Sequence, residues 1–402
     1  MSIYRVFRRS ISFDKCFSIS PILGVTRYTL RLRRCEGKNV NVKNCVTDTK
    51  AKFNKKESWY SFVRRWELTL PAGIGVSLLA VLQWRHLRRH PYPRSDDGTQ
   101  EPVNDFIVTC YCCLPLRITS RIWGWIASIE LPMSLRPTLY GFYARLFHAN
   151  LDEIDVDLSI FPSLVEFFVR PLKSDARPIA QNTNIVSPAD GTILHFGKVS
   201  SCCVEQVKGV TYNLRNFLGH LDEKPILSDC DYVKSLLSNP LNELYQIIIY
   251  LAPGDYHRFH SPADWKIELR KHFQGKLLSV NPRIASFIPD LFSLNERVVY
   301  IGKWLGGFMA YAAVGATNVG SIRVYFDKDL STNTIKWPLA KHWEDEKLAS
   351  PEVRKGDLFG EFRMGSTIVL LFEAPADFQF CLQPGQQIKV GQALTNCMVK
   401  DV

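Results

Sequence analysis

The stretch GDLFGEFRMGSTIVLLFE, residues 356–373, joins a glycine-rich segment to a continuous apolar run. Its third glycine, Gly365, directly precedes Ser366, so the peptide carbonyl in front of the serine has no side chain beside it. The β-branched and aromatic residues 368–372 are typical of a buried strand. Ser366 is therefore expected at a junction between a loop and a core strand. An ordinary Gly-Ser turn has the same local pattern, so the rest of the chain has to decide between the two.

Short β-branched runs recur in the part of the chain after residue 160, separated by Gly, Pro, Asn and Asp turns. These runs occupy residues 185–186, 247–251, 298–301 and 322–326. Because no long helices alternate with them, the pattern predicts an α+β fold with a β-rich, mostly antiparallel catalytic domain. The segment PGQQIKVGQAL, residues 384–394, resembles the biotin and lipoyl carrier fold, so the C-terminal part is expected to be barrel-sandwich-like. No Met-Lys-Met attachment lysine is present, which argues against a carrier role.

The basic charge of the chain is confined to its N-terminal part. The 402 residues carry a net charge of +11, whereas residues 1–65 alone contain 16 Lys and Arg against four acids. The remainder is close to neutral, which argues against a nucleic-acid partner and against attraction of a substrate by bulk charge. The hydrophobic fraction of 46% is sufficient for one large or two modest domains.

The front of the chain has the composition of a targeted and membrane-anchored protein. Residues 1–50 form a basic leader that begins rich in Arg and Ser and poor in acids, as in mitochondrial targeting segments; a disordered basic tail is the alternative. Residues 64–84 include 17 consecutive uncharged residues between basic flanks, with Trp66 and Trp84 near the ends, and predict one transmembrane helix. A buried soluble helix is the alternative there, because Pro71 and two glycines weaken the helix.

Three further regions follow the anchor. Residues 85–116 are predicted to be a linker, and residues 117–160 mix aromatic and basic side chains in a way typical of membrane-proximal helices, although ordinary packed helices would share this composition. Residues 161–402 form the expected catalytic domain. The 11 cysteines are odd in number and lack zinc-site spacing, so we expect them to be reduced or buried and expect no metal site.

Three groups of residues are candidates for chemistry. Asp190 lies in a Pro-x-Asp-Gly turn, which is also a common hairpin turn. His257 and His260 follow an apolar strand, where they suit proton transfer, although either one can serve only to satisfy hydrogen bonds. Ser366 needs a base, and the base needs an orienting acid; Asp190, one of the two histidines and Ser366 supply these roles. A serine hydrolase is therefore possible, but the Gly-x-Ser-x-Gly nucleophile elbow is missing.

Four separated motifs, in order, resemble the phosphatidylserine decarboxylase proenzymes. They are VSPADGTI (186–193), YLAPGDYHRFHSP (250–262), AVGATNVGSI (313–322) and FRMGSTIVLLFEAP (362–375). The segment FPSLVEFFVRPLKSDARPI (161–179) is also similar, and the resemblance extends over residues 117–402. The basic leader and the single apolar span are similar to the mitochondrial branch of this family.

The resemblance implies that the proenzyme cuts itself between Gly365 and Ser366. The products would be a β chain ending at residue 365 and an α chain of residues 366–402, which remain together as a heterodimer or a higher oligomer. Ser366 becomes a covalent pyruvoyl group, the pyruvate cofactor of the family, and forms a Schiff base with the substrate. Asp190 and His260 act as relay partners of Ser366, and His257 is assigned to substrate binding or proton donation.

The activity implied is the conversion of phosphatidylserine in the membrane to phosphatidylethanolamine and carbon dioxide. The implied location is the mitochondrial inner membrane, with the catalytic domain facing the intermembrane space. Two rival hypotheses leave the Gly365–Ser366 bond intact: a membrane-tethered serine hydrolase that uses the same three residues, and a lipid-binding module without chemistry. Met364 replaces the leucine that commonly precedes Gly-Ser-Thr in the family, a change of little volume.

Overall fold

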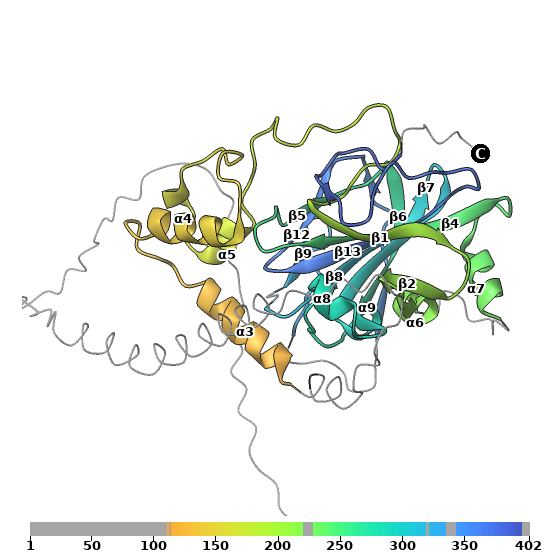
Figure 1. Cartoon of the computed structure of the whole chain (residues 1–402), viewed down its shortest axis with the longest axis horizontal. Helices are drawn as coiled ribbons and strands as arrows, with labels where there is room; N and C mark the ends of the chain where they lie inside the picture. The colour runs from red at the N-terminus through yellow and green to blue at the C-terminus, as the bar shows by residue number, and fades with distance from the viewer. Residues whose placement is uncertain (1–110, 112–113, 220–227, 319–320, 335–342, 396–402) are drawn as a thin grey trace, which may run out of the picture. The chain divides into compact units, whose positions relative to one another are not determined.

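The computed structural model of the chain describes residues 111, 114–219, 228–318, 321–334 and 343–395 (Figure 1). The expected leader, the transmembrane anchor and most of the linker lie outside these residues. The described helices are α3 (Leu116–Ala127), α4 (Arg136–Phe147), η2 (Leu158–Ile160), α5 (Leu164–Phe168), α6 (Leu214–Leu218), α7 (Asp229–Leu236), α8 (Pro282–Ala285) and α9 (Leu291–Leu294). The described strands are β1 (Gly191–Val199), β2 (Cys203–Val207), β3 (Val210–Asn213), β4 (Asn242–Leu251), β5 (Arg258–His260), β6 (Trp265–Phe273), β7 (Arg297–Trp304), β8 (Gly307–Gly315), β9 (Ile322–Val324), β10 (Trp343–Lys347), β11 (Glu352–Val353), β12 (Leu358–Phe362), β13 (Ser366–Pro375) and β14 (Gln387–Ile388).

One large antiparallel sheet organises the described part of the chain. It has nine strands in the order β10-β6-β7-β8-β13-β4-β1-β14, with β11 also paired to β6. A three-stranded sheet, β5-β12-β9, and the hairpin β2-β3 complete the β structure of these residues. The prediction of a β-rich, mostly antiparallel α+β fold is confirmed.

Both faces of the large sheet are covered by apolar structure. Alternate residues of its central strands belong to two separate cores, because successive side chains of a strand point to opposite faces. One core, which includes Val369, packs under α6 to α9 and the β2-β3 hairpin. The other core, which includes Ile368 and Leu370, packs under β5 and β12.

Strand β13 runs through the middle of this sheet, between β8 and β4 (Figure 1). Every residue from Ser366 to Ala374 is buried. A strand buried on both faces has a continuous apolar sequence rather than an alternating one, which explains the run at 368–372.

Most of the expected strands are present. Residues 247–251, 298–301 and 368–372 lie within β4, β7 and β13, and residues 322–324 form β9. The strand expected at residues 185–186 was wrong: Val186 makes only an isolated bridge to Ala393, because its backbone N–H is taken by the carbonyl of Pro262. The C-terminal stretch expected to be barrel-sandwich-like contributes β14, which pairs with β1 at the edge of the large sheet.

The region expected to hold membrane-proximal helices contains α3 and α4, each of 12 residues. Arg117 connects α3 to the segments that flank β6 and β7. Its Nη1 lies 2.7 Å from the carbonyl oxygen of Gly275 and 3.2 Å from a carboxylate oxygen of Glu296. Helices with the length and apolarity needed to cross a bilayer do not occur among the described residues.

Candidate functional site

Ser366 is the first residue of β13, at the predicted junction between a loop and a core strand. It is paired on one side with Leu251 of β4 and on the other with Gly315 of β8. Its side chain is on the same face as that of Ile368, toward the core that β5 and β12 cover. Its hydroxyl is fully buried and has no hydrogen-bond partner among the described residues. A buried hydroxyl without a partner costs free energy, which is typical of a group kept for chemistry.

The two residues before Ser366 both have left-handed backbone conformations. Met364 has a φ of 91° and Gly365 a φ of 51°. Glycine adopts this region freely, but a residue with a side chain is strained there, at a cost of roughly 1–3 kcal/mol. The side chain of Met364 is held in an apolar cluster with Ala127, Val165 and Phe168, which links this strained peptide to α3 and α5.

His257 lies in the loop between β4 and β5 and is fully buried. Its Nδ1 is 2.8 Å from the backbone carbonyl oxygen of Asp255. Because a carbonyl oxygen only accepts, Nδ1 carries the proton and Nε2 is the basic nitrogen. Nε2 has no partner among the described residues, and burial lowers the pKa of His257 to about 3. The ring packs against Phe168 with 4.0 Å between the centroids and 47° between the ring planes. His257 is therefore a neutral imidazole with a free basic nitrogen.

His260 ends β5, and both of its ring nitrogens already have partners. Nδ1 is 2.8 Å from the carbonyl oxygen of Gly356, and Nε2 is 3.3 Å from the hydroxyl of Tyr256. Burial lowers the pKa of His260, which keeps this imidazole neutral as well. The strand brings His260 next to the Asp190 turn, since its backbone N–H donates to the carbonyl of Pro188 at 2.7 Å.

Asp190 is bound by an arginine that sequence reasoning missed. The Arg177 guanidinium donates to both carboxylate oxygens, and the backbone N–H of Val390 donates to Oδ1 at 2.8 Å. Arg177 also donates to Glu153 at 2.7 Å. Burial alone would raise the pKa of Glu153, but the pairing of Glu153 with Arg177 and Lys389 outweighs burial and lowers this pKa to about 2. The only hint of Arg177 in the sequence was its place in the 161–179 segment.

The structure thus brings Asp190 and His260 into the same region, but the predicted relay residues do not hydrogen-bond to one another. Asp190 connects through Arg177 to Tyr256, whose ring centroid is 6.0 Å from the guanidinium carbon, and Tyr256 in turn contacts His260. Within the described residues, Asp190 makes no hydrogen bond to His260, and Ser366 makes none to either histidine.

Residues 164–396 match the family model described as phosphatidylserine decarboxylase. The chain belongs to the phosphatidylserine decarboxylase family. Relatives named phosphatidylserine decarboxylase proenzyme, mitochondrial, include one from Pongo abelii, 48% identical over 71% of this chain and 73% of the relative, and one from Caenorhabditis elegans, 39% identical over 85% and 84%. A proenzyme 1 of the same description from Saccharomyces cerevisiae is 37% identical over 72% and 74%. The chain is an enzyme that decarboxylates phosphatidylserine.

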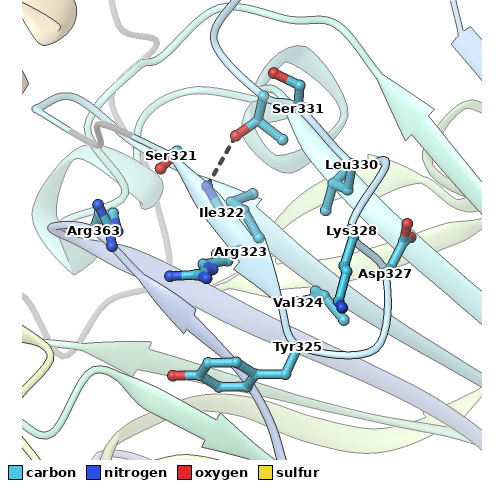
Figure 2. A pocket seen from close by; sticks show the side chains of 11 residues that line it. Ser321, Ile322, Arg323, Val324, Tyr325, Asp327, Lys328, Leu330, Ser331 and Arg363 are labelled. Atoms are coloured by element: carbon cyan, nitrogen blue, oxygen red, sulfur yellow. Dashed lines mark hydrogen bonds between the residues drawn. The ribbon is translucent and has the colours of Figure 1, made fainter. Parts of the chain in front are cut away.

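The decarboxylase has a surface hollow of about 410 Å³ that is lined in part by Arg363, two residues before Gly365 (Figure 2). It is lined along β9 and the loop after it, with Arg363 reaching in from the segment before Ser366. Its two arginines are offset by buried Glu361, which lies 3.2 Å from Arg363 and 3.8 Å from Arg323. None of the predicted site residues lines this hollow. Arg363 therefore holds the segment before Ser366 to Glu361 and, at 3.5 Å, to Glu166.

The helices α3 and α4 of the decarboxylase expose two apolar stripes. The side chains recur at spacings of three and four residues, so each stripe lies on one helical face. The stripe residues are between 37 and 61% exposed, and they are Ile118, Ile122, Trp125 and Ile129 on and after α3, and Leu135, Leu139, Phe142 and Leu146 on and before α4. Contiguous exposed apolar side chains of this kind mark a surface that binds a protein or a membrane.

No group of three or more His, Cys, Asp and Glu residues with metal-ligand geometry occurs within the described part of the decarboxylase.

Proposed function

We propose that this decarboxylase is made as a proenzyme that cuts its own chain between Gly365 and Ser366. The observation that carries the proposal is the combination of a strained Met364–Gly365 backbone with a buried Ser366 hydroxyl that lacks a partner. Strain raises the free energy of the uncut peptide, and a nucleophile without competing hydrogen bonds is free to attack the Gly365 carbonyl. The products would be a β chain ending at residue 365 and an α chain of residues 366–402, held together by the β13 pairings with β4 and β8.

In this proposal Asp190, His260 and Ser366 form the relay that activates the serine. His260 is the base, and Asp190 is the acid that stabilises the imidazolium formed when His260 takes the proton. Three contacts of the uncut chain have to yield for this to happen. The Tyr256 hydroxyl has to leave His260 Nε2, the Gly356 carbonyl has to leave His260 Nδ1, and the Asp190 carboxylate has to share its charge between Arg177 and the ring.

A competing assignment gives the base role to His257. It is favoured by one observation: His257 Nε2 is a buried basic nitrogen with no partner, whereas Nε2 of His260 already has one. We retain His257 for the decarboxylation step, where a neutral imidazole with a free nitrogen can hold or deliver the proton that the product carbon needs. Separate substitution of the two histidines distinguishes the assignments.

A pyruvoyl group at residue 366 would supply the electrophilic carbonyl that the twenty amino acids lack, so that it takes up the electrons left by departing carbon dioxide. The surroundings of Ser366 fit such a group: the position is fully buried in the central strand, and Met364, Phe168 and His257, which contact one another in that order, are buried as well. The chain's own contribution is to orient the substrate amine, to exclude water and to place an imidazole next to the reacting carbon.

The substrate is a membrane lipid, so the site has to reach a bilayer. The apolar stripes of α3 and α4 would dip into the headgroup region, while α5 carries Phe168 toward His257. We place the enzyme at the mitochondrial inner membrane, with the catalytic domain facing the intermembrane space; the names of the relatives support the organelle. The predicted leader and the predicted anchor at 64–84 would deliver and hold it there.

The intact mass of the purified protein tests the processing. The mature enzyme should contain a small chain that starts at residue 366 and is lighter than its serine-started form by one ammonia, because the α-amine is lost to a carbonyl and the hydroxymethyl side chain becomes a methyl group. The variant Ser366→Ala should remain one full-length chain without decarboxylase activity. A wild-type protein that is active as one uncut chain with an unmodified Ser366 would refute the proposal and favour a serine-based mechanism.

A further inference from the structure

Arg170 is a buried cation that makes no direct ion pair with a carboxylate of the described residues; Asp190, Glu153 and Asp255 act on it only from a longer distance. Its side chain is 2% exposed, and one guanidinium nitrogen donates to the carbonyl oxygen of Gly254 at 2.9 Å. Among the described residues, the other two nitrogens, Nε and Nη1, have no hydrogen-bond partner, and no carboxylate comes within 4 Å of the group. The guanidinium carbon lies 5.4 Å from the centroid of the Phe167 ring, which compensates the charge only in part. A buried charge that is neither paired nor fully hydrogen-bonded is costly, so its retention needs a reason.

Other buried arginines of the chain show what a structural role requires. In Arg297 all three guanidinium nitrogens donate to backbone carbonyls, at 2.7 to 2.9 Å. Arg270 pairs with Asp327 at 2.7 Å, and Arg177 binds Asp190 through two nitrogens. Arg170 lacks both kinds of compensation, so it has donors left for a ligand.

Arg170 also lies beside the candidate site. Its partner Gly254 belongs to the loop that runs from Leu251, the neighbour of Ser366 in β4, to His257. Two residues before Arg170, Phe168 packs against the His257 ring. The positive charge of Arg170 contributes, after burial, to the lowered pKa of His257. The free guanidinium donors and the free imidazole nitrogen therefore share one small region.

We propose that Arg170 binds an anionic oxygen of the serine phospholipid head group and so determines the affinity for substrate. The phosphate and the carboxylate of this head group each lie only a few bonds from the amine that reacts, and a guanidinium matches the oxygens of either. In the uncut chain Met364 packs against Phe168 and closes this region. Substrate access then rests on the proposed cut after Gly365, which frees that segment at one end.

The test compares Arg170→Met with Arg297→Met in the full-length protein. Methionine keeps an apolar stem of similar length and removes the charge. For Arg170→Met we expect normal processing by intact mass, an unfolding temperature equal to or above that of the wild type, and a KM for phosphatidylserine vesicles raised about tenfold to a hundredfold at a kcat within about twofold. For Arg297→Met we expect a lower unfolding temperature and an unchanged KM, because three satisfied donors are lost. Arg170→Lys should restore part of the affinity.

Two soluble inhibitors identify which anion Arg170 holds. Glycerophosphoethanolamine carries the phosphate without the carboxylate, and L-serine carries the carboxylate without the phosphate. The compound whose inhibition constant rises in Arg170→Met, while remaining unchanged in Arg297→Met, contains the bound anion.

Three results would overturn the assignment: a wild-type KM in Arg170→Met, a fall in its unfolding temperature as large as that of Arg297→Met, or unchanged inhibition by both compounds. A wild-type protein that proves to be uncut refutes the processing proposal instead. In that case the KM comparison on the uncut enzyme still decides the role of Arg170.

Discussion

The indole Nε1 of Trp123 donates to the thioether sulfur of Met364 at 3.1 Å. Met364 directly precedes Gly365, the glycine of the proposed scissile bond. Trp123 lies on α3, so this contact fixes a helix to the strained segment from a distance of 241 residues in the chain. We expect Trp123→Phe to slow self-cleavage by roughly fivefold, since loss of a weak hydrogen bond of about 1 kcal/mol lets Met364 leave its left-handed conformation. The rate is measured as the appearance of the two chains after synthesis of the full-length protein.

Trp125 is the matched control for this change, because it lies two residues further on the same helix and is 61% exposed. Trp125→Phe should be cut at the wild-type rate. Met364→Leu removes the sulfur acceptor, so adding Trp123→Phe to it should have no further effect. Additive slowing in the double variant would show that Trp123 acts through general packing rather than through Met364.

The central part of the fold follows from local sequence, whereas the surroundings of the site do not. The apolar run at 368–372 predicts β13 because a strand covered on both faces needs no alternation. The same reasoning placed Ser366 at a strand start. No local pattern could show that Arg177 would take the Asp190 carboxylate, or that Val390 would donate to it from 200 residues away. Contacts of that kind are set by how the sheet edge and the loops pack.

The two histidines differ in a way that sequence spacing cannot reveal. Both were candidates because they follow an apolar strand, but one nitrogen of His257 is left without a partner while both nitrogens of His260 are engaged. Tautomer and hydrogen-bond occupancy depend on the carbonyls of Asp255 and Gly356, which are positioned by the fold.

Substitution of each histidine separates the roles proposed for them. His260→Ala should leave the chain uncut, since the serine loses its base, whereas His257→Ala should be cut at least partly and decarboxylate poorly. The cut is measured by intact mass and the decarboxylation by carbon dioxide release per cut chain. The reverse result, with an uncut His257→Ala and a cut His260→Ala, would transfer the base role to His257 Nε2.

Burial of His257 makes a specific prediction for stability against pH. The pKa of His257 in the folded state is about 3, below the ordinary 6.5, so the folded state binds fewer protons than the unfolded state. The stabilisation of the folded state by the neutral ring is therefore complete above pH 6.5 and is lost as the pH falls toward 3. His257→Asn keeps a donor for the Asp255 carbonyl and cannot be protonated. Between pH 6.5 and pH 4 the wild type should therefore lose about 3 kcal/mol more than His257→Asn.

The comparison is made by chemical denaturation in the Ser366→Ala background, so that both proteins are single chains. Burial raises the pKa of the nearby Asp255 to about 6, which gives an opposite slope between pH 4 and 6, but this carboxyl is present in both proteins and its effect cancels. Equal slopes for the two proteins would mean that His257 is solvated in solution.

The exposed stripes of α3 and α4 should matter only when the substrate is in a bilayer. A charge at Ile122 or Phe142, which are 50 and 61% exposed, costs little folding free energy but opposes burial of the stripe in the headgroup region. For Ile122→Asp and Phe142→Asp we expect about a tenfold loss of activity on phosphatidylserine vesicles, at unchanged activity on a short-chain phosphatidylserine below its micelle concentration. Leu241→Asp is the control, because Leu241 is 82% exposed and precedes β4 rather than lying on these helices. The short-chain substrate does not require the enzyme to contact a bilayer, so activity on it reports the catalytic domain alone. An equal loss of activity on both substrates would mean that the stripes contribute to folding and not to membrane binding.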